Sequence, residues 1–147
     1  MGYHRHDHER RPHTRPPRRR LRPCFGHSDL LLCCERISPG ALGHIVDEEL
    51  TAGRIGKKFK DLVRNMPASP ERETLGELAS EFLRLVEVRN AILHGKPCTA
   101  PSGEQRLSGG RIWEPQDLLD AADAFTACSI KLNQHLHSFL SVYQPAR

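Results

Sequence analysis

The stretch ERETLGELASEFLRLVEVRNAIL, residues 71–93, decides the fold because its apolar side chains recur every three or four residues. That spacing places them on one face of an α-helix, and other helices must cover that face. The seam consists of Leu75, Leu78, Phe82, Leu85, Arg89 and Ile92. Gly95 and Pro97 follow and indicate the helix end. The stretch therefore predicts a long core helix in an all-α domain.

Arg89 is the exception in this seam, since a cation stands where Leu would be expected. An Arg is almost never buried without a partner or a function. Asn90 follows it directly, and His94 lies four residues after Asn90 on the same helix face. A guanidinium can hold a phosphate, and an imidazole can move a proton near neutral pH. The alternative is an internal ion pair of Arg89 with a carboxylate such as Glu87 or Asp123.

Two helical segments precede this stretch. Ser28 is placed to cap a short helix that ends at Ile37. Ser38 and Pro39 then have the residue types of an N-cap and a first helical position. These residues predict that a second helix starts directly after Ser38.

The second segment, residues 40–66, has apolar or small residues at close to helical spacing. Gly53 and Gly56 lie on that stripe. They would either let another helix approach closely or divide the segment near Thr51. Pro67 ends it.

Residues 95–113 are rich in Gly and Pro, which predicts a long loop or a small hairpin around 99–107. Trp113 and Leu118 are spaced as a hydrophobic staple around a helix start, with Pro115 at its first position. The last helix continues in a 4-3 alternation through Leu118, Ala122, Phe125, Ser129, Leu132, Leu136, Phe139 and Tyr143. The predicted fold is an up-and-down bundle of about four helices.

The net charge of +4 is unevenly distributed. Residues 1–23 carry eight Arg against two acids, a net charge of +6, and the other residues carry fourteen Lys and Arg against sixteen acids, a net charge of −2. We therefore expect a disordered basic tail over residues 1–27 and a helical domain over residues 28–147. The tail is either an arm for nucleic acid or an incidental extension.

No apolar run approaches the roughly 20 residues that span a bilayer, and no apolar segment of a secretion signal follows the N-terminus. We expect a cytoplasmic protein with no membrane contact. The five cysteines lack the spacing of a zinc site and are expected to be reduced thiols. No metal site and no cofactor is expected from the sequence.

The segment around Lys57, Lys58 and Lys60, with Arg54 and Arg64, predicts a basic helix face. Two interpretations stay open for it, a solvated surface and contact with a phosphate backbone.

Arg89 followed directly by Asn90, and by His94 after a spacer of four residues (90–93), at the end of the third helix resembles the HEPN superfamily. Its signature is an Arg, often followed directly by a polar residue, and then a His, with four to six residues between the Arg and the His. The resemblance covers roughly residues 38–143.

The resemblance implies a metal-independent endoribonuclease, acting as a toxin or in defence, in which the RNA 2′-hydroxyl attacks the adjacent phosphodiester. It implies Arg89, Asn90 and His94 as catalytic residues and a homodimer, with a cognate antitoxin as a further partner. A dimer would gather the cations Lys96, Arg106 and Arg111 around one RNA-binding cleft. The alternative is a non-catalytic HEPN-like module for dimerisation, nucleotide binding or protein interaction.

Overall fold

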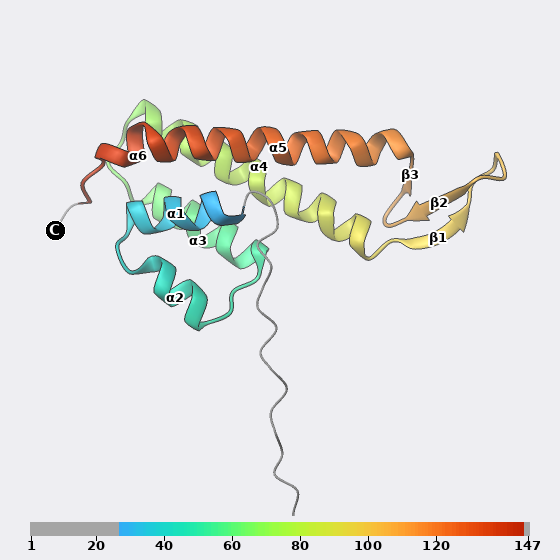
Figure 1. Cartoon of the computed structure of the whole chain (residues 1–147), viewed down its shortest axis with the longest axis horizontal. Helices are drawn as coiled ribbons and strands as arrows, with labels where there is room; N and C mark the ends of the chain where they lie inside the picture. The colour runs from blue at the N-terminus through green and yellow to red at the C-terminus, as the bar shows by residue number, and fades with distance from the viewer. Residues whose placement is uncertain (1–26, 146–147) are drawn as a thin grey trace, which may run out of the picture.

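The computed structural model describes residues 27–145, which are mostly helical with one small sheet (Figure 1). The helices are α1 (His27–Ile37), α2 (Ala41–Asp47), α3 (Ala52–Arg64), α4 (Pro70–Leu93), α5 (Pro115–His137) and α6 (Phe139–Val142). The strands are β1 (Lys96–Thr99), β2 (Gln105–Ser108) and β3 (Ile112–Trp113). The predicted tail lies outside the described residues except for His27, which begins α1, so Ser28 lies inside that helix and is not its N-cap.

Four helices, α1, α3, α4 and α5, surround the core. α3 and α4 run in opposite directions, because Gly53 lies against Val86 and Gly56 against Leu83. α1 and α5 run in the same direction (Figure 1). Asp29 there accepts a hydrogen bond from Ser129 at 2.9 Å, and the Cys33 thiol donates one to the Leu132 carbonyl at 3.7 Å. The predicted up-and-down order is therefore wrong for α1, because α2 returns the chain before α3 begins.

The connection between α1 and α2 corrects the predicted helix start at Ser38. Gly40 has φ of 92° and ψ of −9°, and the Ala41 N–H donates to the Ser38 carbonyl at 3.0 Å. These values describe a type II turn with Pro39 and Gly40 at its centre. The N-terminus of α2 is completed by the Glu35 carboxylate, which accepts hydrogen bonds from Gly40 N–H at 2.9 Å and Leu42 N–H at 2.8 Å.

Residues 40–66 form two helices, α2 and α3, and the break between them lies near Thr51, which was one of the two expected alternatives. Gly56 is buried where α3 crosses α4. A Cβ atom at Gly56 would lie 2.8 Å from Leu83 Cδ2 and 3.0 Å from Phe82 Cδ1, so any other residue there would require these two side chains to shift. The segment is therefore divided near Thr51, and both glycines lie inside α3, where α4 approaches closely.

α4 confirms the predicted long core helix. It begins at Pro70, after Ser69, whose hydroxyl accepts the Arg72 N–H at 3.1 Å. Leu75, Leu78, Phe82 and Leu85 are buried, whereas Arg89 and Ile92 at the end of the seam are half-buried. The first two-thirds of α4 is therefore core, and its last two turns extend beyond the start of α3.

The chain between α4 and α5 contains a three-stranded antiparallel sheet in the order β1-β2-β3. The predicted hairpin is confirmed and is longer than expected, since Lys96 pairs with Ser108 and Leu107 with Trp113. The all-α class is corrected by this sheet. Figure 1 shows it at one end of the molecule, where α4 ends and α5 begins.

α5 begins with the predicted arrangement of Trp113 before the cap and Pro115 at the first helical position. Its N-cap is Glu114, and the Glu114 and Asp117 side chains each accept the backbone N–H of the other, which forms a capping box. None of the described helices has the length and apolar character that crossing a membrane requires.

Candidate functional site

Arg89 lies half-buried in the last two turns of α4. Its Nη2 donates a hydrogen bond to Asn90 Oδ1 at 3.1 Å, and its buried Nε has no acceptor. Within residues 27–145, no carboxylate forms an ion pair with Arg89, so the expected alternative of pairing with Glu87 or Asp123 is not present. A guanidinium in this state retains hydrogen-bonding capacity for an anion from outside.

His94 is the C-cap of α4 and is exposed. Its backbone N–H donates to the Asn90 carbonyl at 2.9 Å, which places the two residues one above the other at the helix end. The imidazole is therefore accessible to a ligand that contacts the Asn90 side of the helix. A hydrogen bond therefore joins the side chains of Arg89 and Asn90, and His94 lies one helical turn after Asn90.

The sheet fixes this end of α4. A Cβ atom at Gly95 would lie 3.5 Å from Leu107 Cβ, so β2 follows the helix end closely. Gly109 packs on Ala91, and its carbonyl accepts a hydrogen bond from buried Trp113 Nε1 at 3.2 Å. The turns around the motif are thus held by a contact that the spacing of the motif did not reveal.

The three cations expected around the motif differ in their surroundings. Lys96 is exposed at the start of β1. Arg106 is paired with Glu104 and, through Nε at 2.7 Å, with Glu114. The hydrogen bond to Glu114 is the main cause of a raised pKa of Arg106. Arg106 therefore ties β2 to the start of α5.

Arg111 lies beside the sheet. Its Nη2 is 3.0 Å from Asp117 Oδ1, and its guanidinium carbon is 4.3 Å from the centre of the Trp113 ring. Arg111 is more than half exposed and can still face a ligand. The carboxylates that hold the two arginines were missed in the sequence, although Glu114 and Asp117 stand at the cap positions of the predicted helix.

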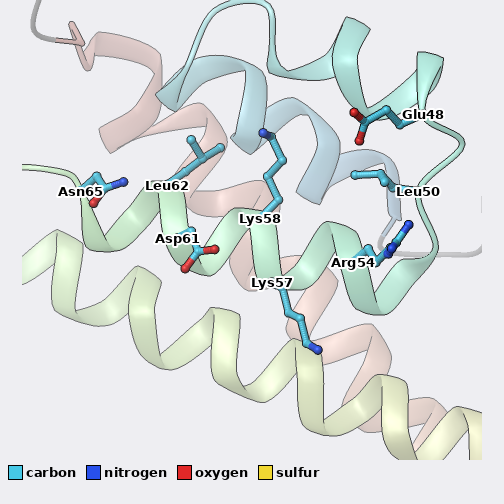
Figure 2. Close-up of a pocket in the computed structure, with 8 residues that line it drawn as sticks. All are labelled: Glu48, Leu50, Arg54, Lys57, Lys58, Asp61, Leu62 and Asn65. Carbon is cyan, nitrogen blue, oxygen red and sulfur yellow. The ribbon is translucent and has the colours of Figure 1, made fainter.

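A second surface feature lies away from the motif. A hollow of about 500 Å³ opens on the solvent side of α3 (Figure 2). Its lining consists of Glu48, Leu50, Arg54, Lys57, Lys58, Asp61, Leu62 and Asn65. The predicted basic helix face is therefore present and borders a depression.

The thiols of α1 are buried beneath the helices that cover it. Burial raises the pKa of Cys33 and of Cys34 to about 12 each. Both are free thiols, as are Cys98 and Cys128. Within residues 27–145, no three His, Cys, Asp or Glu side chains are grouped as ligands of a metal ion.

In comparisons with known proteins, no family model matched the chain, and no curated protein or solved structure matched it significantly. The resemblance to HEPN proteins therefore stays a prediction that depends on the motif and its position.

Proposed function

We propose that the protein is a metal-independent endoribonuclease of the HEPN type, with Arg89, Asn90 and His94 as its site. The observation that carries the proposal is the state of Arg89. Its guanidinium is half-buried, and no carboxylate among the described residues forms an ion pair with it. The positive charge of Arg89 is therefore available to a bound anion. An RNA phosphodiester supplies that anion.

The proposed reaction needs proton transfer and charge stabilisation. The RNA 2′-oxygen forms a bond to phosphorus, and the bond from phosphorus to the 5′-oxygen breaks, which leaves a 2′,3′-cyclic phosphate and a 5′-hydroxyl. A base takes the proton of the 2′-hydroxyl, and an acid gives a proton to the leaving 5′-oxygen. His94 serves as one of these groups, Arg89 stabilises the charge on the phosphorane, and Asn90 orients the guanidinium.

A homodimer suits this chemistry, because the motif of each chain supplies one histidine to a reaction that uses two proton transfers. Exposed apolar side chains near the motif support contact with a second copy. Leu93 is 67% exposed, Leu119 59% and Ile112 44%. They come from the end of α4, the start of α5 and β3, which lie at the same end of the molecule (Figure 1). In the dimer Lys96 and Arg111 would face the bound RNA.

The second candidate function is a non-catalytic module for dimerisation, nucleotide binding or protein interaction. The observation that favours it is Arg106, because two carboxylates already neutralise this expected RNA-binding cation. A module of this kind would use the same apolar end for contact with its partner.

The test is cleavage of RNA in EDTA by the full chain, with the product ends identified by mass spectrometry. We expect cyclic phosphate ends from the wild type and none from His94→Ala, with unchanged helical circular dichroism. His137→Ala is the matched control, since His137 is also an exposed histidine at a helix end. Equal cleavage by both variants would show that the nuclease proposal is wrong.

The dimer and the biological role have separate tests. Sedimentation at micromolar concentration should give twice the chain mass of 16.6 kDa, and a monomer would contradict the dimer. The toxin role predicts that expression arrests growth unless a cognate antitoxin is expressed with it.

A further inference from the structure

The positive charge of the described residues is concentrated on α3. This helix carries Arg54, Lys57, Lys58, Lys60 and Arg64 against the single acid Asp61, a net charge of +4. The other residues of 27–145 carry eight Lys and Arg against fifteen acids, a net charge of −7. A helix with this charge in an otherwise acidic domain creates a local attraction for polyanions.

Most of these cations are not neutralised within the molecule. In the part of the chain that the structure describes, Arg54, Lys57, Lys58 and Lys60 form no ion pair. Both carboxylates that line the hollow have other partners. Asp61 pairs with Arg64 at 3.0 Å, and Glu48 contacts His44 at 3.3 Å. The hollow therefore presents more available positive charge than the mixture of acidic and basic residues in its lining indicates.

The composition of this face favours a nucleic acid over a protein partner. Protein interfaces are depleted in Lys and enriched in aromatic side chains. Here the apolar side chains in the lining are only Leu50 and Leu62, which are half-buried, and no aromatic residue contributes. Lysines and arginines clustered along one helix are the electrostatic footprint of phosphate-backbone binding.

The side of α4 that faces α3 carries part of the candidate site. Leu83 of α4 contacts Gly56 of α3. Asn90 lies seven residues after Leu83 on α4, and His94 lies four residues after Asn90. These three positions share one helix face. A Cβ atom at Gly53, in the first turn of α3, would lie 3.9 Å from Val86 Cγ1. Val86 is about one helical turn before Asn90 on α4.

The row of cations leads away from the site. Arg64 lies seven residues after Lys57, with Lys60 between them, which is about 10 Å of helix axis. Figure 2 shows Lys57 extending toward α4 and Lys58 toward the opposite side of α3. A strand lying along α3 would therefore meet cations on both sides before it reaches the end of α4 that carries Asn90.

We propose that the solvent face of α3 binds the phosphate backbone of single-stranded RNA and guides that strand toward Asn90 and His94. The guidance of a substrate toward the site rests on the proposed nuclease function, whereas the binding of RNA by α3 does not depend on that function. The contacts are to phosphates, so the binding is independent of base sequence and weakens with salt.

The test compares two double variants of the full chain, both in a His94→Ala background that prevents cleavage. Lys57→Gln with Lys60→Gln removes two charges from α3. Arg36→Gln with Lys131→Gln removes two exposed charges from α1 and α5, outside the lining of the hollow. Residues 1–26 are the same in both, so the difference between the variants reports on α3. Binding of a fluorescein-labelled single-stranded RNA is followed by anisotropy at several salt concentrations.

The α3 variant should lower the slope of log affinity against log salt by about 1.4, which is about 25-fold in affinity at 0.1 M salt if the affinities converge at 1 M. The control should change affinity by less than about threefold. Lys57→Arg with Lys60→Arg keeps the charge and should keep the affinity, which separates a charge effect from a folding defect.

The inference is overturned if the two double variants lose the same amount of RNA affinity. It is also overturned if the parent chain does not bind RNA, or if the α3 face binds only an acidic protein. With His94 intact, the α3 variant should raise the RNA concentration for half-maximal cleavage and leave the saturated rate unchanged; a fall in the saturated rate alone overturns the guidance. RNA binding that depends on α3 without any cleavage would refute the nuclease and leave the α3 site standing.

Discussion

Gly109, in the turn between β2 and β3, packs directly on the backbone carbonyl of Ala91 in the last turn of α4. A Cβ atom at this glycine would overlap the Ala91 carbonyl oxygen and approach Trp113 Nε1 to 3.3 Å. The small sheet therefore supports the helix segment that carries Arg89 and His94. The position of the candidate site depends on a residue fifteen positions after His94 in the sequence.

Gly109→Ala should lower the free energy of unfolding by about 1–3 kcal/mol, because the neighbouring atoms are backbone and cannot move aside cheaply. Urea denaturation measures the change. Gly76→Ala is the matched control, since a Cβ atom there meets no atom within 4 Å and alanine favours the helix. That variant should gain up to about 1 kcal/mol. Equal effects of the two substitutions would contradict the packing of Gly109 on Ala91.

Arg89→Leu should leave the free energy of unfolding unchanged or raise it by about 1–2 kcal/mol, since it removes a buried Nε that has no acceptor. The same variant should lose RNA cleavage. Leu85→Ala, one turn earlier in the seam and fully buried, should cost about 2–5 kcal/mol. If Arg89→Leu destabilised the protein as much as Leu85→Ala, Arg89 would be a structural residue.

Glu35 gives the α1–α2 connection a dependence on pH. The hydrogen bonds from the Gly40 and Leu42 backbone lower the pKa of Glu35. A carboxyl whose pKa is lower in the folded state stabilises the fold above its unfolded pKa, and the contribution is lost as pH falls through the folded pKa. Glu35→Gln should therefore be less stable than wild type at pH 7, with a smaller difference at pH 3. Urea midpoints at both pH values measure this, and a constant difference would exclude the ionised carboxylate as the cause.

Cys33 and Cys34 should resist alkylation in the native protein. Their pKa of about 12 leaves about one thiolate in 10⁴ at pH 8, and both side chains are buried. Among the four cysteines that the structure describes, iodoacetamide labelling followed by mass spectrometry should modify half-buried Cys98 first. Labelling of Cys33 and Cys34 should rise together along the urea unfolding transition. Fast labelling of either thiol in native buffer would show that α1 separates from α5 and α3.

Two Ser-Pro pairs show where the sequence pattern stops being informative. Ser69 and Pro70 form an N-cap and a first helical residue, whereas Ser38 and Pro39 begin a type II turn. The difference depends on Gly40, which adopts a positive φ that few other residues tolerate. The Ser-Pro pattern predicted a helix start at Ser38 and Pro39, which is wrong, because that pattern does not include Gly40, the residue after the proline.

The candidate site shows the same division. The seam spacing correctly placed Arg89 at the end of a core helix, since helical periodicity is a local property of the chain. It could not predict the pairing of Arg106 with Glu104 and Glu114, which requires β2 to fold back beside the start of α5. Whether a cation remains available to a ligand depends on such contacts.

The sequence by itself determined the long helix that carries Arg89 and His94 and the start of the last helix at Pro115, because each arises from residues within a few turns of one another. Only the tertiary structure decided the parallel course of α1 and α5, the packing of Gly109 on Ala91 and the absence of an ion pair for Arg89 among the described residues. These features depend on segments far apart in the chain, whose approach is fixed by the burial of the shared core and not by local spacing.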